Sequence, residues 1–406
     1  MSVTAFIGAG AVIGIGGPTT GTLTTEVKRR RQWTGNPRHP HARVPAIRRI
    51  ADALDRYFAP GTANFEDIFH ALESLDSLRV GLQPTTAKEF KPALGAFVMP
   101  NAAALYSAIV CTGALNHIID DVAKQIMRYV RSFRPLGTHR WFRDFWQNAT
   151  GRCPWDIATL NYDDCIERSL ARAAWDDGFA ALDPGILRFD PARIVNANAT
   201  RVLHLHGSVF YGYPRFTNPN RFLFEDQHED LYRFTSHTEA KRTWFWRSRN
   251  RAQSGESAIA GPIITGQRKP DKLLGIPYST YQAVLHAALL NSPRLLVAGY
   301  SFGDLHFNRL LSRLTRIHGG NRRVVIIDYA PPGIRGPRWH PDFSIRDWPS
   351  IEMFQALIRL SGESKPLECP YAHPWVSRDG RCRFYLEGFE DAVRAHGTDI
   401  IDFLTT

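Results

Sequence analysis

Short apolar runs alternate along the chain with longer segments in which apolar residues recur at spacings of three and four. The short runs are typical of buried strands and lie at residues 2–7, 156–160, 202–205, 261–266, 294–300 and 322–329. The longer segments are typical of amphipathic helices and lie at about 20–31, 165–175, 279–290, 305–319 and 385–396. This alternation predicts an α/β fold, a Rossmann-like parallel sheet with helices on both faces.

Two parts of the chain depart from the alternation. Between about residues 43 and 150 the pattern is helical, with Ile47, Ile50 and Leu54 on one face, so we predict a large helical insertion. Residues 211–258 are rich in aromatic residues, Arg and Asn, and predict a long excursion. We expect a domain over residues 1–334 that contains the insertion, followed by a C-terminal extension over 335–406 whose role the sequence does not indicate.

The composition indicates a globular protein without a membrane span. No apolar run reaches about 18 residues, and the N-terminus lacks the basic leader of a signal peptide. Five cysteines without a CxxC pair argue against a zinc ribbon and a disulfide framework, so we expect a cytoplasmic protein. The net charge of +11 leaves nucleic acid open as an indirect partner, although the basic cluster at 28–31 is most simply the solvated end of a helix.

Glycines and polar residues gather where the predicted strands end. They are Gly8, Ala9 and Gly10 after the first strand, Asn161, Tyr162 and Asp163 after the second, His206 after the third, Gly299, Ser301, Phe302 and Asp304 at the fifth, and Asp328 at the sixth. Ligands of open parallel sheets bind beyond the carboxyl ends of the strands. The sequence therefore predicts one pocket that these residues share.

Each of these motifs has a second explanation when it is taken alone. The segment GAGAVIG does not have the GxGxxG spacing, since Gly14 arrives one position late. Its glycines could approach a phosphate or simply turn the chain, and the segment after Gly299 is equally ambiguous. Asn161 and Asp163 could cap the helix that we predict to begin near Asp163.

The stretch RVLHLHGSVF places His204 and His206 two residues apart, on the same face of a strand. A metal pair would need a third ligand, and the nearby sequence offers no spaced set of His, Cys or Glu, so no metal is expected. His204 lies within the strand and suits a core position. Histidine titrates near neutrality and can act as a base. His206 is the better candidate of the two, because it lies at the strand end, where Gly207 gives access.

The ordered set of motifs resembles the sirtuin-like superfamily. It consists of GAG near the N-terminus, TxNYD at 159–163, LHGS at 205–208 and GYSFGDLHFN at 299–308. More narrowly, it is similar to the bacterial sirtuin-like NAD hydrolases of antiphage defence systems. The likeness runs in order from about residue 3 to 330.

The resemblance implies a site that binds NAD. In it, Asn161, His206 and Asp163 would be catalytic, with His206 as the catalytic histidine and Asp163 beside the carboxamide. The residues implied to bind the nucleotide are Gly8, Ala9, Gly10, Tyr162, Gly299, Ser301, Phe302, Asp304 and Asp328. Asp328 would lie at the adenosine ribose.

The sequence departs from the protein-deacylating sirtuins, which carry a zinc module of two CxxC pairs and a serine where Val12 stands here. The resemblance therefore implies an NAD hydrolase that yields nicotinamide and ADP-ribose, and that acts as a toxic effector in antiphage defence by depleting NAD. It also implies a homo-oligomer paired with a hexameric ATPase of the HerA type. A protein deacylase, and a non-catalytic subunit that binds ADP-ribose or nucleic acid, stay open as alternatives.

Overall fold

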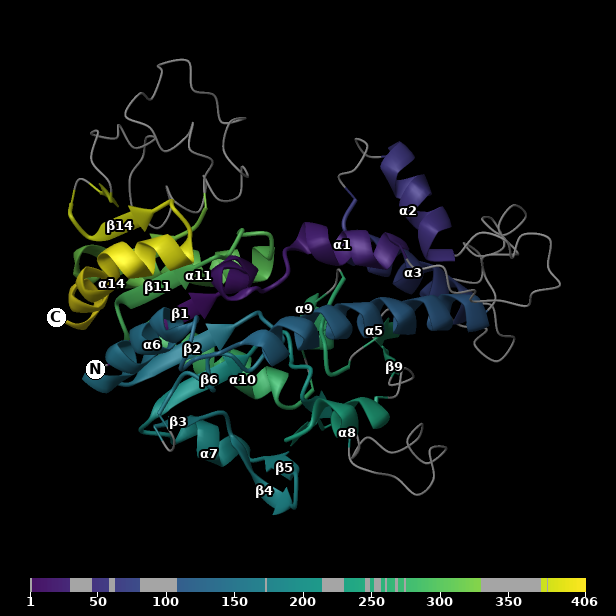
Figure 1. Cartoon of the computed structure of the whole chain (residues 1–406), viewed down its shortest axis with the longest axis horizontal. Helices are drawn as coiled ribbons and strands as arrows, with labels where there is room; N and C mark the ends of the chain where they lie inside the picture. Colours follow the sequence, from purple (N-terminus) through teal and green to yellow (C-terminus); the bar gives the residue numbers. More distant parts are fainter. Residues whose placement is uncertain are drawn as a thin grey trace.

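The computed structural model describes residues 2–29, 46–57, 63–80, 108–171, 174–213, 230–244, 249–251, 257–259, 261–266, 269–273, 275–329, 374–377 and 379–406 (Figure 1). Its centre is an eight-stranded sheet in the order β13-β14-β12-β11-β1-β2-β6-β3. Only β13 pairs antiparallel with its neighbour, and the other strands are parallel. The predicted Rossmann-like α/β fold is confirmed.

The strands of this sheet are short, apolar and buried. Their bounds are Val3–Ile7 (β1), Trp155–Thr159 (β2), Trp175–Asp176 (β3), Thr200–His204 (β6), Arg294–Ala298 (β11), Arg323–Ile327 (β12), Trp375–Val376 (β13) and Cys382–Tyr385 (β14). All five side chains of β1 and all five of β2 are buried, which is the pattern of central strands covered on both faces.

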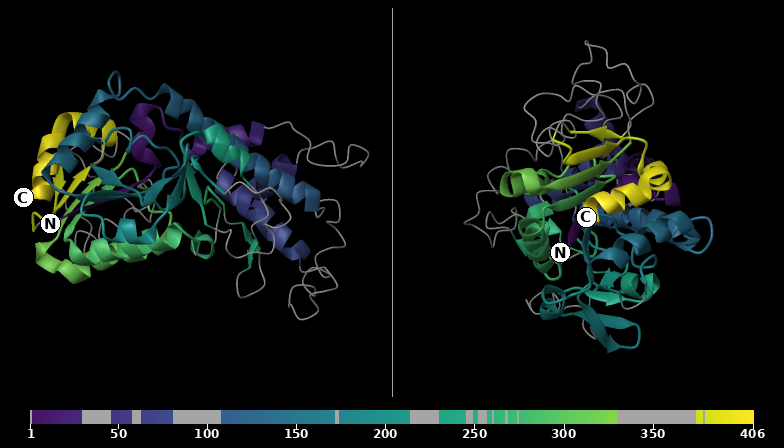
Figure 2. Two further views of the ribbon diagram at one scale, coloured as in Figure 1. Left: turned by 90° about the horizontal axis from the view of Figure 1, so that it is seen from below. Right: turned by 90° about the vertical axis from the view of Figure 1, so that its left-hand side faces the viewer.

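Helices cover both faces of the sheet, and the side chains of β1 contribute to the core on each face. Val3, Ala5 and Ile7 join a core with the first set of helices, whereas Phe6 joins a separate core with the second set. The first set comprises α5 (Ala108–Ser132), α6 (Arg140–Arg152) and α14 (Phe389–Thr405). The second set comprises α10 (Tyr278–Asn291) and α11 (Leu305–His318). The left view of Figure 2 shows α14 and α11 on opposite sides of the sheet.

The helical block predicted between β1 and β2 contains α1 (Thr20–Arg29), α2 (Ala46–Tyr57), α3 (Phe65–Val80), α5 and α6. Figure 1 shows α1, α2, α3 and much of α5 extending beyond the carboxyl end of the sheet. A two-stranded sheet of β9 (Arg249–Arg251) and β10 (Ser257–Ile259) lies against α3. This block therefore forms a wall above the strand ends where the predicted pocket should lie.

The excursion predicted at 211–258 is not irregular throughout. Together with the preceding segment it forms a four-stranded sheet in the order β4-β5-β8-β7. Its elements are β4 (Phe179–Asp183), β5 (Ile186–Phe189), β7 (Tyr211–Gly212) and β8 (Tyr232–Phe234), with α7 (Pro191–Val195) and α8 (His237–Arg242) beside them.

The helix predicted at 165–175 is wrong. Residues 165–170 form successive turns, in which the Ser169 hydroxyl donates to the Cys165 carbonyl over 2.7 Å. Glu167 in this segment is buried and bonded to His204, so a carboxylate occupies an inward-facing position for which the helical pattern predicts no polar partner.

The strand predicted at 261–266 is also wrong. This segment makes an isolated bridge, Gly207 to Ile263, beside the loop that follows β6. The Ile264 N–H donates to the His206 carbonyl over 2.8 Å, and the Ser208 N–H donates to the Pro262 carbonyl over 3.0 Å. The apolar run is buried because it covers the His206 loop and not because it enters the sheet.

Residues beyond 335 contribute to the main sheet. The strand β14 pairs in parallel with β12, and α14 packs against α6. The predicted helix at 385–396 is therefore present, but it begins and ends later, at Phe389–Thr405. None of the described helices combines the length and apolarity that a membrane span requires.

Candidate functional site

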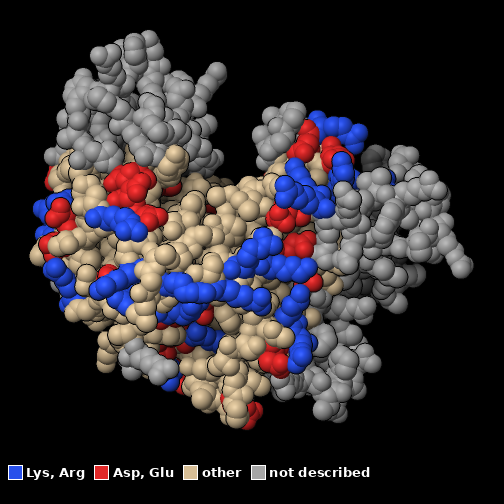
Figure 3. Space-filling model, in the orientation of Figure 1, with Lys and Arg blue, Asp and Glu red and all other residues tan. Residues whose placement is uncertain are grey.

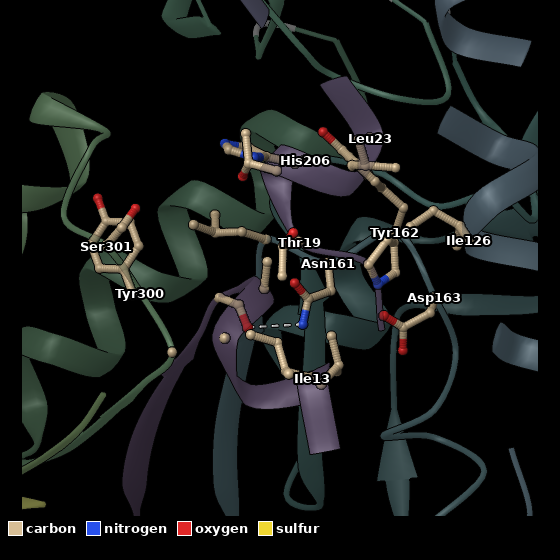
Figure 4. A pocket seen from close by; sticks show the side chains of 18 of the residues that line it. Ile13, Thr19, Leu23, Ile126, Asn161, Tyr162, Asp163, His206, Tyr300 and Ser301 are labelled. Carbon is tan, nitrogen blue, oxygen red and sulfur yellow. Dashed lines mark hydrogen bonds between the residues drawn. The ribbon is translucent and has the colours of Figure 1, made fainter. Parts of the chain in front are cut away.

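A cavity of about 300 Å³ opens at the carboxyl edge of the sheet. Five strand ends contribute to its wall, from β1, β2, β6, β11 and β12, and α1, α3 and α5 of the helical block close it from above (Figure 4). The predicted residues that line it are Gly8, Ala9, Gly10, Asn161, Tyr162, Asp163, His206, Gly299, Ser301, Asp304 and Asp328. The structure therefore brings together residues that are up to 320 positions apart in the sequence.

Phe302 is the predicted residue that does not line this cavity. Its side chain is fully buried and packs on Tyr300, with ring centroids 4.9 Å apart. Its backbone has φ of 57°, and its carbonyl accepts a hydrogen bond from the Asn308 side-chain N–H over 2.6 Å. Phe302 thus supports the loop after β11 from below, because an apolar ring gains more in the core than at a polar wall.

The loops after β1 and β11 touch through their backbones. The Gly10 N–H donates to the Gly299 carbonyl over 2.9 Å. A Cβ atom on Gly299 would lie 2.0 Å from the Ala11 nitrogen, and φ at Gly299 is +60°. The position therefore requires glycine both for space and for conformation, and it leaves the floor of the cavity as bare backbone.

We expect Gly299→Ala to lower the free energy of unfolding by at least about 3 kcal/mol, because the methyl group would displace the backbone of the first loop. Chemical denaturation measures this effect. Gly151→Ala is the matched control, since a Cβ there meets nothing within 4 Å and the residue lies in α6. It should raise the stability by up to about 1 kcal/mol, and a loss below about 1 kcal/mol for Gly299→Ala would contradict the packing described.

Asn161 projects into the cavity from the end of β2. Its amide donates to the Gly8 carbonyl over 3.1 Å, and its backbone N–H donates to the Thr159 hydroxyl over 3.0 Å (Figure 4). Asn161 is 8% exposed and does not cap a helix, since turns follow it. The first and second strand ends are therefore joined by one side chain whose amide oxygen is not used in that bond.

Asp163 lies deeper in the wall and turns the chain after β2. Its Oδ1 accepts the Cys165 N–H over 2.9 Å, and the Tyr129 hydroxyl interacts with the same carboxylate. Burial raises the pKa of Asp163 above its usual range. Tyr129 of α5 lies near Asp163. Burial raises the pKa of the Tyr129 phenol, and the negative charge of Asp163 raises it further. Tyr162 beside them donates its hydroxyl hydrogen to the Ile264 carbonyl over 3.1 Å.

His206 faces the cavity from the loop after β6. Its ring is 3% exposed, and its Nε2 atom has no hydrogen-bond partner in the part of the chain that the structure describes. Burial, and then the positive charge of Lys269, lower the pKa of His206 to about 3, although Asp304 opposes this. The expectation that His206 titrates near neutrality is therefore wrong for this structure, because desolvation outweighs the attraction of a carboxylate 4.0 Å away.

Three charged residues at the cavity wall form an ion network. The Lys269 ammonium lies 2.8 Å from Asp304 Oδ1 and 3.1 Å from Glu66 Oε1. Burial alone would lower the pKa of Lys269, but Glu66 and Asp304 raise it above its usual value. Burial raises the pKa of Asp304, but His206 and Lys269 together lower it overall. A cation is thus held at the wall with its charge largely balanced.

Sequence reasoning missed Glu66 and Lys269. Glu66 reads as an ordinary acidic residue in the first turn of a helix, here α3, and Lys269 begins a four-residue helix, α9 (Lys269–Lys272). They lie 203 residues apart and meet only in the folded chain. No local pattern in the sequence predicts that these two residues form an ion pair.

Residues 156–348 match the family model of the SIR2-like domain. Over these residues the chain is similar to a SIR2-like domain. The match covers slightly less than half of the chain, and no curated protein is similar enough in sequence to count as a match.

The matched residues account for somewhat less than half of the cavity wall. They contain the loops of Asn161, His206, Gly299 and Asp328, whereas β1 and the Gly8 loop precede the matched residues and complete the sheet. Since SIR2-like domains use NAD, the match indicates an NAD-dependent protein in general terms.

The residues of the cavity fit NAD. A Cβ atom on Gly8, Gly10 or Gly299 would collide with the backbone of the facing loop, so the two loops pack closely and present bare backbone to the cavity, which a diphosphate can approach. Asp328 can accept hydrogen bonds from ribose hydroxyls, and burial raises its pKa to about 6. The apolar side chains of Ile13, Leu23 and Ile126 offer surfaces for a planar ring, and they are seen beside Asn161 in Figure 4.

Among the residues that the structure describes, no three His, Cys, Asp or Glu side chains cluster as the ligands of a metal ion would.

His204 is 2% exposed and paired with Glu167, so its predicted core position is confirmed.

Proposed function

We propose that the cavity binds NAD and cleaves its nicotinamide–ribose bond, with water as the acceptor. The observation that supports this most directly is the convergence of two side chains. The amide of Asn161 and the unpartnered Nε2 atom of His206 face one cavity whose floor is glycine backbone. That arrangement suits a sugar anomeric carbon held between a polar amide and a neutral imidazole.

The chemistry needs little acid catalysis. The pyridinium of NAD is cationic and departs as neutral nicotinamide, while the ribose gains oxocarbenium character, as it does in glycoside cleavage. The protein must therefore fix the ribose, orient one water molecule and receive its proton. Asn161 can orient the water through its amide oxygen, which is not used in the bond to Gly8.

His206 suits the role of proton acceptor because it is neutral. A histidine with a pKa of about 3 is unprotonated throughout the physiological range and presents a lone pair at Nε2. Asp304 Oδ2, at 4.0 Å, is the negative group nearest to the imidazolium that would form, and its attraction already limits how far the pKa falls.

Water is a better candidate for the acceptor than an acyl-lysine. The zinc module that supports the peptide groove of protein deacylases needs two CxxC pairs, and the five cysteines of the chain form none. Purified protein should therefore release nicotinamide and ADP-ribose in equal amounts from NAD alone. An unchanged NAD pool, or release that requires an added acetyl-lysine peptide, would contradict the proposal.

The biological role follows from the same proposal. Hydrolysis of NAD would deplete a cell of it, and the resemblance to antiphage NAD hydrolases suggests that the protein is a toxic effector of such a defence. The same resemblance is the support for a homo-oligomer and for a hexameric ATPase partner of the HerA type. Gel filtration with and without a candidate ATPase tests both assemblies.

A second candidate function, polyanion binding, is favoured by one surface. Lys124, Arg128 and Arg131 are exposed and lie on one face of α5, at spacings of four and three residues. Arg128 and Arg131 pair with no acidic side chain among the described residues. Figure 3 shows Lys and Arg side chains forming a band across this face of the molecule.

We expect the double charge reversal Arg128→Glu, Arg131→Glu to weaken binding to short single-stranded DNA at least tenfold at low salt. Each phosphate contact contributes through counterion release, so the dependence of the binding constant on salt should also become shallower. Fluorescence anisotropy measures both. The double variant Arg309→Glu, Arg313→Glu on exposed positions of α11 is the control. Equal losses in the two variants would show that only overall charge matters.

A further inference from the structure

His204 and His206, which are two residues apart in the sequence, have opposite hydrogen-bond environments. His206 Nε2 lacks a partner among the described residues, whereas both ring nitrogens of His204 face acceptors. His204 Nε2 lies 2.7 Å from Glu167 Oε1, and its Nδ1 lies 3.3 Å from the Asn161 carbonyl oxygen. The His204 ring is 2% exposed, so water cannot easily replace either bond.

These two contacts determine the protonation state of His204. A carboxylate and a backbone carbonyl can only accept hydrogen bonds, and a neutral imidazole has only one N–H to donate. The imidazolium, with an N–H on each nitrogen, satisfies both partners at once. A neutral ring would leave one buried acceptor facing a lone pair, which costs more than a lost hydrogen bond in a dry environment.

The charged groups around His204 favour the cation. Burial alone would lower its pKa, but the charge and hydrogen bond of Glu167 raise it overall. Asp163 adds to the rise, and Asp177 also lies within electrostatic range. Arg233 of β8 opposes it, although that guanidinium is itself paired with Asp177. The ring of Tyr211 packs on His204, with centroids 5.8 Å apart, and adds no charge.

We infer that His204 is a positioning residue that is protonated at pH 7 and holds the Asn161 loop in place by donating from Nδ1 to the Asn161 carbonyl. Asn161 has three anchors: this bond, the bond of its backbone N–H to Thr159, and the bond of its amide to Gly8. Of these, only the bond from His204 can be removed by a change of pH. A buried cation and a neutral imidazole thus stand two residues apart, one positioning Asn161 and the other facing the cavity.

The protonation state can be measured without any enzymatic activity. Nitrogen-15 NMR of histidine-labelled protein, assigned through the backbone, should show two protonated ring nitrogens in His204 at pH 7. The signals should titrate only at a pH above 6.5, since a raised pKa keeps the proton until the pH exceeds the unfolded value. A ring that is unprotonated at either nitrogen at pH 7 would overturn the inference.

The positioning role rests on the proposed hydrolysis of NAD, and it has a separate test. His204→Gln should lower kcat by about 10²-fold with KM changed little, because the Asn161 loop shifts while the nucleotide loops stay intact. Glu167→Gln should move the alkaline limb of the pH–rate profile to lower pH, since it removes the charge that retains the proton. The exposed His286→Gln on α10 is the control for both.

The two tests separate failure of the inference from failure of the proposed function. An inactive wild-type protein with a doubly protonated His204 would contradict the proposed function alone. An active wild-type protein whose rate is unchanged by His204→Gln would contradict the positioning role, whatever the NMR result.

Discussion

Replacing His206 with alanine is expected to lower the rate of NAD hydrolysis by about 10²–10⁴-fold, the usual contribution of a positioned general base. The imidazole is the neutral acceptor in the cavity wall, and among the residues described no other side chain there combines an unpartnered ring nitrogen with a carboxylate 4.0 Å from it. Nicotinamide release from purified protein measures the effect. NAD affinity should change little, because the nucleotide loops are elsewhere.

The control for this substitution is His286→Ala, which removes a histidine from the exposed face of α10. It should leave the rate and the melting temperature unchanged. If His206→Ala hydrolysed NAD at the wild-type rate, the assignment of the base would fail, and the neutral histidine would be a packing residue of the loop after β6.

Asn161→Ala is expected to lower the same rate by about 10²-fold or more, because two functions are lost together. The amide oxygen would no longer orient water, and the bond from the amide to the Gly8 carbonyl would no longer hold the first loop against the second. Loss of that one hydrogen bond should cost only about 1 kcal/mol of stability. The fall in rate should therefore greatly exceed any effect on folding.

Asn148→Ala is the matched control, since Asn148 lies on the exposed side of α6 and away from the cavity. Rates and denaturation midpoints of the two variants should be measured side by side. An Asn161→Ala protein that keeps the wild-type rate, or whose loss of rate is matched by a loss of folded protein, would remove Asn161 from the mechanism.

The location of the site could be predicted from the sequence because the sheet obeys a simple rule. Short apolar runs such as those of β1 and β11 are visible without any structure, and parallel strands bring their carboxyl ends to one edge. Gly8, Asn161, His206 and Gly299 therefore had to meet if the strands were assigned correctly. The structure bears out this convergence.

The electrostatics of the site could not be predicted, because they depend on burial and on partners distant in sequence. Local sequence says only that His206 ends a strand, whereas its lowered pKa comes from desolvation and from Lys269, 63 residues away. The segment at 165–175 has helical spacing, yet its Glu167 turns inward to His204. The strand β14 was not predicted, because it follows a long stretch rich in Pro, Trp, His and Arg that has no clear apolar pattern.

The central claim is that the strand-end loops form the binding site of NAD, with the nicotinamide ribose between Asn161 and position 206. The most direct measurement is a crystal structure of the His206→Ala protein with NAD bound. The account predicts the diphosphate against the Gly8 and Gly299 backbone, and the nicotinamide ribose within hydrogen-bond reach of the Asn161 amide. NAD bound elsewhere on the molecule, or with its nicotinamide directed away from Asn161, would contradict it.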